Sequence, residues 1–228
     1  MDKKMNVLNV QLDDYTAKDA MKAVTEYMHT EPVNTVEIIT VDILMRAAQT
    51  DGMKESIENL DMVIAGDESI LEAAEVTEKK KLQEAHNQVF MKLVFHYFHK
   101  NHSRLFLLAD SLDGTKKLEQ YLQSGYSGIQ IVGTACVPDD ESVDDLITNQ
   151  INGVEADCVL ASMVSPKQEE FIGRCKNALN ARIWLGIGTE SGFMLQRVTW
   201  RTRLKEFLFR KILKREVEKD KKKVGNNS

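Results

Sequence analysis

Proline and glycine are scarce in this chain, which has 3 prolines and 12 glycines in 228 residues. An all-β fold with frequent turns needs more of both, so the composition favours long regular elements. Hydrophobic runs are short as well, and none approaches the roughly 18 uninterrupted apolar residues of a membrane-spanning helix. Residues 1–15 contain charges but neither the apolar segment nor the cleavage site of a secretory signal, so we expect no secretion.

Several sequence motifs are also absent. The 3 cysteines are odd in number and have no C-x-x-C spacing, which predicts reduced thiols in a cytoplasmic protein. The chain contains no G-x-x-x-x-G-K-[ST] loop and no G-x-S-x-G segment. These absences exclude a Walker-type phosphate site and leave hydrolase chemistry of the nucleophile-elbow type without support.

The charges are unevenly distributed, although the net charge is only −5. Between Arg197 and Lys223 lie 12 of the 30 basic and only 4 of the 35 acidic residues, so this tail carries +8 and the rest of the chain −13. A basic tail on an acidic body predicts an anionic partner for the tail alone.

Six short apolar runs, rich in β-branched residues, alternate with helical stretches. Most are continuously apolar, as strands buried on both faces must be. This rhythm predicts an α/β fold with a Rossmann-like, doubly wound and mostly parallel sheet, and it fits a helix bundle poorly. The predicted strands are 36–41, 62–65, 105–109, 129–132, 158–162 and 183–187. The predicted helices between them include one long helix over 84–100.

We expect one core domain, residues 1–196, followed by a basic helical appendage, residues 197–228, with a disordered end. The appendage has an apolar stripe at helical spacing from Trp200 to Ile212. It could dock on its own domain or lie on an anionic membrane surface. Nucleic acid is disfavoured as a partner because the body is acidic and no reading motif is present.

Ligands of such sheets bind at the carboxyl ends of the strands, so the loops there are the candidate sites. After the fifth strand, Ser165 is placed to cap a helix that begins at Pro166, and Gln168 would complete a capping box. This segment is either only a helix start or, with Lys167, a seat for a phosphate or diphosphate. After the sixth strand, Gly186, Gly188 and Gly192 would let the backbone approach a ligand, a weak signal alone.

Polar residues also lie at the ends of the first two predicted strands. Asp67 is either a helix N-cap or a general base, and Thr40 and Asp42 share this ambiguity. His96, His99 and His102 are spaced along one helical stretch, but no cysteine or paired acid completes a metal site with them. We interpret these histidines as surface or packing residues and expect no metal.

The order of these motifs resembles the TagA/WecG/CpsF glycosyltransferases over about residues 5–215. Members are inverting, metal-independent enzymes without a cofactor, which move an N-acetylmannosamine-type sugar from UDP to a polyprenyl-diphosphate-linked N-acetylglucosamine. The resemblance implies a cytoplasmic protein peripheral to the inner face of the bacterial cell membrane, acting in teichoic acid or other surface polysaccharide synthesis. The motifs that carry it are Thr40-x-Asp42, Asp67, Ile131-Val132-Gly133-Thr134, Ser165–Glu169, Gly186-Ile187-Gly188 and Glu206-Phe207-Leu208-Phe209-Arg210.

The resemblance also assigns roles. Asp67 matches the proposed catalytic base of the family, Thr40 the threonine beside it, and Gln168 a glutamine near the nucleotide sugar. Basic tail residues are implied to meet the diphosphate and the membrane. The expected substrate-binding residues are Thr40, Asp42, Ser165, Lys167, Gln168, Gly186, Gly188, Arg197, Arg210 and Arg215.

The chain departs from the family pattern around these positions. Gly66-Asp67-Glu68 stands for Pro-Asp-Gly, Asp42 stands for an asparagine, and 79–87 replaces an Arg-Val-Thr-Gly segment. A second hypothesis is therefore a non-catalytic member that binds a nucleotide sugar or lipid diphosphate in a wall-assembly complex. A membrane-surface adaptor and self-association of the chain are further alternatives.

Overall fold

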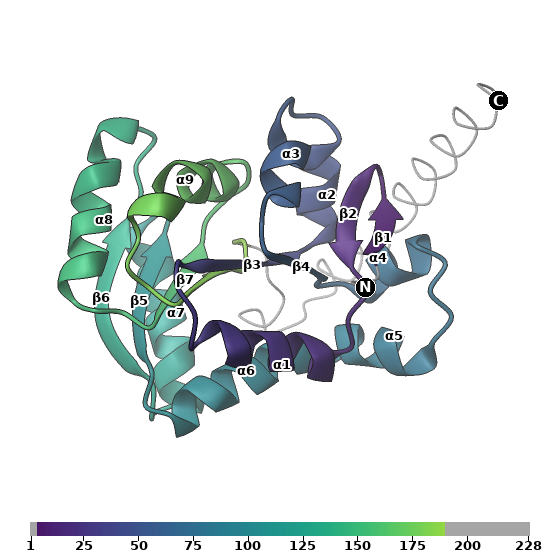
Figure 1. Cartoon of the computed structure of the whole chain (residues 1–228), viewed down its shortest axis with the longest axis horizontal. Coiled ribbons are helices and arrows are strands. Elements are labelled where there is room, and N and C mark those ends of the chain that lie inside the picture. The colour runs from purple at the N-terminus through teal and green to yellow at the C-terminus, as the bar shows by residue number, and fades with distance from the viewer. Residues whose placement is uncertain (1–3, 190–228) are drawn as a thin grey trace.

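The apolar runs form a six-stranded, wholly parallel sheet in the order β4-β3-β8-β7-β5-β6 (Figure 1). The computed structural model describes residues 4–189. All six predicted strands are present, and all but the edge strand β6 are largely buried, as apolar strands between two helix layers must be. Their bounds are Asn34–Ile39 (β3), Met62–Ala65 (β4), Arg104–Ala109 (β5), Gln130–Cys136 (β6), Cys158–Ser162 (β7) and Ile183–Gly186 (β8).

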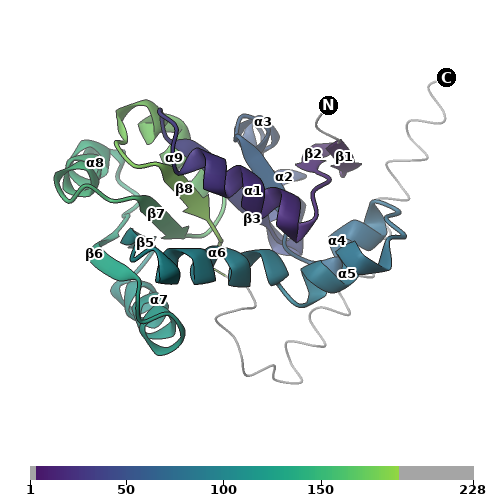
Figure 2. The same cartoon turned by 60° about the horizontal axis from the view of Figure 1, so that its bottom comes forward.

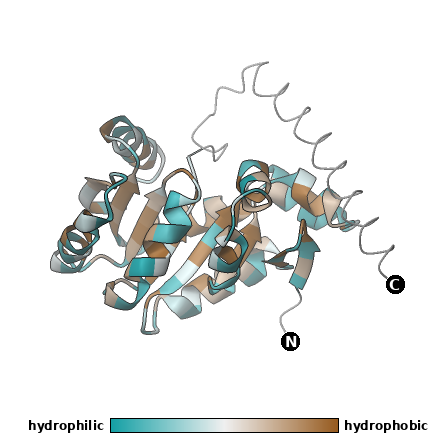
Figure 3. Ribbon diagram, turned by 90° about the horizontal axis from the view of Figure 1, so that it is seen from above, coloured by the Kyte–Doolittle hydropathy of each residue, from teal (hydrophilic) through white to brown (hydrophobic). Residues whose placement is uncertain are grey.

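Helices cover both faces of this sheet, which confirms the predicted doubly wound α/β class (Figure 2). One face packs against α1 (Ala17–Tyr27), α6 (Val89–Lys100) and α7 (Leu112–Gly125). The other face packs against α2 (Val41–Ala47), α3 (Met53–Glu58), α8 (Asp144–Gly153) and α9 (Lys167–Cys175). Seen from above, the strands between the helix layers are mostly apolar, whereas the helices alternate apolar and polar residues (Figure 3). Shorter elements are α4 (Glu68–Ala73), α5 (Lys79–His86) and the 3₁₀ turns Glu141–Val143 and Lys176–Ala178.

A small antiparallel hairpin precedes the main sheet and was not predicted. It consists of β1 (Lys4–Val7) and β2 (Val10–Asp13), joined by Leu8 and Asn9, which both have positive φ. The Asp13 carboxylate accepts a hydrogen bond from Val63 N of β4 at 2.8 Å and pairs with Lys4 Nζ at 2.6 Å. The hairpin is thereby fastened beside the edge strand of the main sheet (Figure 1).

Several predicted boundaries were wrong, and β6 for example runs to Cys136, four residues beyond the predicted end of that strand. The helix expected over 84–100 is split into α5 and α6, because Gln88 adopts a left-handed conformation with φ of 51°. The first predicted strand stops at Ile39 instead of residue 41, since Thr40 already caps α2. Within residues 4–189, no helix is both long and apolar enough to cross a membrane. The predicted helical appendage lies outside the described residues.

Candidate functional site at the carboxyl edge of the sheet

The loops after the parallel strands meet at one edge of the sheet, because all six strands point the same way. Asp67 follows β4 and Thr40 follows the neighbouring β3. Both residues line the same hollow, which encloses about 750 Å³ including the part open to solvent. Most of its wall is apolar and comes from the starts of α1 and α6, the ends of β3 and β4, and Met5 of the hairpin. The structure therefore brings together two of the residues that the sequence singled out.

Asp67 is half-buried at the rim of this hollow. It is the N-cap residue of α4, as one of the two interpretations had it, although its side chain makes no capping hydrogen bond there. Its Oδ2 instead accepts a hydrogen bond of 2.9 Å from Val41 N, at the start of α2. Because Val41 directly follows Thr40, this hydrogen bond fixes the orientation of the Asp67 carboxylate relative to Thr40.

The approach of β4 to β3 at this point depends on a glycine. Gly66 N donates a hydrogen bond of 2.7 Å to Ile39 O. A Cβ atom at residue 66 would lie 2.7 Å from Ile38 Cγ2 and 3.0 Å from the same carbonyl oxygen. Glycine therefore permits the close contact that places Asp67 beside Thr40.

Thr40 acts as an N-cap as well as a wall of the hollow, since its Oγ1 accepts a hydrogen bond of 3.4 Å from Ile43 N. Asp42 does not line the hollow. Its carboxylate forms an ion pair with Arg46 Nε at 2.7 Å, one turn further along α2. The structure thus separates Asp42 from the pair formed by Thr40 and Asp67.

The capping box predicted for Ser165 and Gln168 is wrong. Helix α9 begins at Lys167 without a side-chain cap, and Ser165 Oγ donates instead to Glu169 Oε1 at 2.5 Å. Gln168 is fully buried and points towards the sheet. Its Oε1 accepts from Met163 N and from Gly188 N, both at 3.3 Å, and its Nε2 donates to Glu37 Oε1 at 2.9 Å. Gln168 therefore ties the loop after β7 to the loop after β8.

Two glycines of β8 and its loop make room for this arrangement. At Gly186, a Cβ atom would lie 2.7 Å from Gln168 Nε2 and 3.3 Å from Glu37 Cδ. Gly188 has a φ of 64°, a conformation that side chains disfavour, and its carbonyl accepts a hydrogen bond of 2.9 Å from Ser162 Oγ. The glycines were predicted to let the backbone approach a ligand closely. At Gly186, the group in close contact with the backbone is the side-chain amide of Gln168.

Lys167 lies between two carboxylates. Its Nζ is 2.9 Å from Asp139 Oδ1 and 3.6 Å from Asp110 Oδ1. Asp110 also accepts a hydrogen bond of 2.6 Å from Val164 N. The positive charge proposed for a phosphate seat is therefore already matched by two acidic side chains of the loops after β5 and β6.

An ionisable group that the sequence did not single out lies on β3, the strand next to the edge strand β4. Glu37 is fully buried, and Glu169 next to it on α9 is 1% exposed. Burial raises the pKa of Glu37 well above its usual value, the nearby Glu169 carboxyl raises it further, and the hydrogen bond from Gln168 only partly opposes this. The signal in the sequence was a single acid inside the apolar run 36–39.

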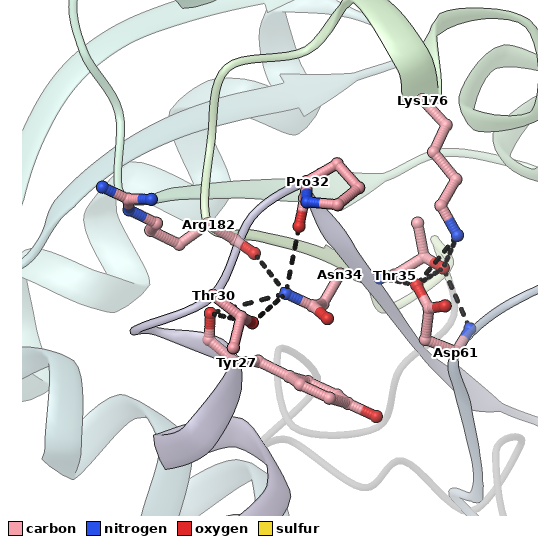
Figure 4. A network of polar contacts seen from close by, with 8 residues as sticks. All are labelled: Tyr27, Thr30, Pro32, Asn34, Thr35, Asp61, Lys176 and Arg182. Atoms are coloured by element: carbon pink, nitrogen blue, oxygen red, sulfur yellow. Dashed lines mark hydrogen bonds and ion pairs between the residues drawn. The ribbon is translucent and has the colours of Figure 1, made fainter.

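At the opposite, amino edge of the sheet, a second polar cluster surrounds the beginning of β3 (Figure 4). Asp61 Oδ2 accepts hydrogen bonds from Thr35 N and Oγ1, both at 2.7 Å, and from Lys176 Nζ at 2.9 Å. The side chain of Asn34 joins the end of α1 to the residue before β8, donating to Thr30 Oγ1, Tyr27 O, Pro32 O and Arg182 O. This cluster connects elements of the fold and lies away from the hollow.

Comparison with known proteins identifies the family to which the chain belongs. The model of the "Glycosyl transferase WecG/TagA/CpsF family" matches residues 5–199. The chain belongs to this family of glycosyltransferases. It is 21% identical over 187 residues to the N-acetylglucosaminyldiphosphoundecaprenol N-acetyl-beta-D-mannosaminyltransferases of Staphylococcus aureus strains MRSA252 and NCTC 8325. The matched segment covers 81% of this chain and 73% of each relative.

The WecG/TagA/CpsF resemblance singled out residues that the structure now places in two groups. Thr40 and Asp67 share the hollow, whereas Ser165, Gln168, Gly186 and Gly188 do not line it and lie around the buried carboxyl groups of Glu37 and Glu169. Arg197, Arg210, Arg215 and Gly192 lie outside the described residues. Three cations at or near this edge are paired with acids: Lys81 with Asp14, Arg46 with Asp42, and Lys167 with Asp110 and Asp139.

The histidines have packing contacts. His99 Nδ1 accepts a hydrogen bond of 2.8 Å from Gly128 N, and His102 Nδ1 lies 3.2 Å from Gly128 O. The His96 and His99 rings are stacked with centroids 6.3 Å apart. The interpretation of His99 as a packing residue is confirmed, because its imidazole fixes the turn before β6.

Proposed function

We propose that this protein transfers an N-acetylmannosamine-type sugar from UDP to a polyprenyl-diphosphate-linked N-acetylglucosamine in surface polysaccharide synthesis. The observation that carries the proposal is the pairing of Asp67 with Thr40 in one hollow at the carboxyl edge of a WecG/TagA/CpsF family member. Relatives that share 21% identity bear the name of this activity.

Asp67 is the proposed general base. In an inverting transfer the acceptor hydroxyl attacks the anomeric carbon while the carboxylate takes its proton. The new bond joins the acceptor oxygen to the sugar, and the bond between the sugar and the diphosphate breaks to release UDP. The hydrogen bond from Val41 N holds one carboxylate oxygen in place. Once the acceptor fills the hollow, the mostly apolar wall would keep out water that competes with the acceptor hydroxyl.

The departing diphosphate needs positive charge in the absence of a metal. Since Lys167 already pairs with Asp110 and Asp139, we assign this role mainly to Arg197, Arg210 and Arg215 of the basic tail. The same tail would attach the protein to an anionic membrane surface, where a lipid-linked acceptor resides. Removal of residues 197–228 is then expected to abolish both vesicle binding and transfer. Unchanged vesicle binding after truncation would reject this part of the proposal.

Asp67→Asn tests the base directly. The amide oxygen can still accept from Val41 N, so folding should be preserved while kcat falls by roughly 10²- to 10⁴-fold. Turnover is measured with UDP-N-acetylmannosamine and a short-chain lipid acceptor, and folding by thermal melting. Asp113→Asn is the matched control, because this exposed acid at the start of α7 lies outside the hollow. A mutant at position 67 with the full wild-type rate would refute the assignment.

The second candidate function is a non-catalytic member that binds the nucleotide sugar or lipid diphosphate. The altered residues around the proposed base favour it, because Gly66 and Glu68 flank Asp67 where the family has Pro and Gly, and Asp42 stands in place of an asparagine. Calorimetry that detects ligand binding without turnover across several acceptors would support this candidate, and robust turnover would eliminate it.

A further inference from the structure

Two carboxyl groups meet in the interior of the protein, next to Gly186 at the end of β8. Glu37 comes from the middle of β3 and Glu169 from the first turn of α9, and both are at most 1% exposed. Their side chains lie within hydrogen-bonding reach of each other. Glu37 Oε1 accepts from Gln168 Nε2 at 2.9 Å, and Glu169 Oε1 accepts from Ser165 Oγ at 2.5 Å.

The second oxygen of each carboxyl group has no donor. Glu37 Oε2 and Glu169 Oε2 are both buried and without a hydrogen-bond partner among the described protein atoms. Two ionised carboxylates cannot donate to each other, and two buried negative charges side by side would repel. A single proton removes both difficulties, because a carboxylic acid donates to the neighbouring carboxylate.

No described cation compensates the pair. The flanking strands β4 and β8 contain no acidic or basic residue. On α9 and the turn after it, Lys167 pairs with Asp110 and Asp139, Arg174 with Asp144 and Glu141, and Lys176 with Asp61. On α2, Asp42 and Arg46 pair with each other. Among the residues of 4–189, the charged group that acts on Glu37 is therefore Glu169.

We propose that Glu37 and Glu169 share one proton, and that this acid pair is a positioning device for the loops that receive the donor sugar nucleotide. Glu37 holds the Gln168 amide, and the Gln168 oxygen holds Met163 N and Gly188 N. Loss of the shared proton would drive the two carboxylates apart and release both loops. Neither acid touches the substrate. That these loops receive a sugar nucleotide depends on the proposed glycosyl transfer. The shared proton does not depend on it.

The shared proton can be observed without any ligand. Infrared spectra are recorded at neutral pH for the wild-type protein and for Glu37→Gln, and one is subtracted from the other. The wild-type protein should show the C=O stretch of a protonated carboxylic acid. Glu37→Gln should lose this band, because its amide donates permanently to Glu169. Glu170→Gln is the matched control, since it removes the charge of the adjacent, exposed acid on the same helix. Absence of the band, or its persistence in the mutant at position 37, would overturn the acid pair.

The positioning role has its own measurement. In wild-type protein, the amide resonances of Gly188 and Met163 should shift as the pH is raised through the ionisation of the pair, and UDP-sugar affinity should fall about tenfold per pH unit beyond that point. Glu37→Gln, which mimics the protonated form, should abolish the amide shifts and keep the affinity. Amide resonances that titrate identically in both proteins would refute the role. A failure of every variant to bind UDP sugars at any pH would reject the proposed function, while the amide shifts would still decide the positioning.

Discussion

Strand β3 carries a polar cluster at its beginning and another near its middle, and the two differ in how their acids are satisfied. Asp61 beside Thr35 is 37% exposed and receives hydrogen bonds from a lysine, a hydroxyl and a backbone amide. Glu37, two residues after Thr35, is fully buried beside another acid. Partial burial raises the pKa of Asp61, but its hydrogen bonds from Lys176 and Thr35 outweigh this and lower the pKa overall.

This difference in how the acids are satisfied distinguishes a cluster that stabilises the fold from one with the properties of a functional site. At the amino edge, solvent and Lys176 stabilise an ionised acid, so the cluster is a conventional fastening between strands. Beneath the carboxyl edge, no cation of the described residues offsets the burial of Glu37. The pKa of this acid, on the same strand, is therefore raised. Perturbed ionisable groups of this kind are concentrated at functional sites.

The largest expected effect comes from Gln168, and Asn34, the amide of the other cluster, provides the comparison. Gln168→Leu leaves Glu37 Oε1, Met163 N and Gly188 N without their partner in a dry interior, so we expect a loss of about 3 to 5 kcal/mol of unfolding free energy. Asn34→Leu removes contacts at a half-buried position that water can replace, at a cost of about 1 kcal/mol. Urea unfolding measures both. Equal losses would remove the distinction between the clusters.

A smaller effect is expected from adding one methyl group beside the buried pair. Gly186→Ala places Cβ 2.7 Å from Gln168 Nε2, and the adjustment should cost about 1 to 3 kcal/mol. Gly173→Ala on α9 is the control, because no atom lies within 4 Å of its added methyl and alanine favours the helix by about 0.5 to 1 kcal/mol. Thermal melts should therefore shift in opposite directions. Destabilisation by both substitutions would contradict the tight contact at Gly186.

The smallest effect concerns Asp61 and depends on pH. Because the folded-state pKa of Asp61 lies below its unfolded value, the carboxylate stabilises the fold above the unfolded pKa, and this contribution disappears as the pH falls through the folded pKa. At neutral pH, Asp61→Asn should cost about 1 kcal/mol, since the exposed part of the side chain is screened by water.

Unfolding free energies measured from neutral to acidic pH should show the wild-type advantage over Asp61→Asn vanish at the acidic end. Glu37→Gln should show the reverse trend. The raised pKa of Glu37 means that its stabilising contribution is present in acid and lost as the pH rises through the folded value. If the two substitutions followed the same pH trend, the contrast between the clusters would be wrong.

The sequence predicted the sheet well because most of its strands are apolar on both faces and recur between helical segments. It missed the hairpin of β1 and β2, whose strands have four residues each and whose turn, Leu8-Asn9, has no glycine. It also missed the break at Gln88, because glutamine is a common helix residue and only tertiary packing gives it a positive φ.

The candidate site was predicted unevenly. The two residues that share the hollow, Thr40 and Asp67, follow neighbouring strands, and a parallel sheet brings such positions to one edge. The capping box at Ser165 had the right spacing but the wrong partners, since spacing cannot reveal that a buried acid on β3 would attract the Gln168 amide. The paired state of Lys167 was equally hidden, because Asp110 and Asp139 come from different loops.

By itself, then, the order of apolar runs determined a parallel α/β sheet and the edge at which its polar residues gather. Period and polarity are local properties of the chain, and the sequence contains them directly. Only the tertiary structure decided which side chains are dry and what charges they face. Glu37 is one acid among 35 in the sequence, and it becomes distinctive only when folding buries it beside Glu169 and away from any cation of the described chain. Desolvation and charge proximity depend on distance in space, which chain order does not specify.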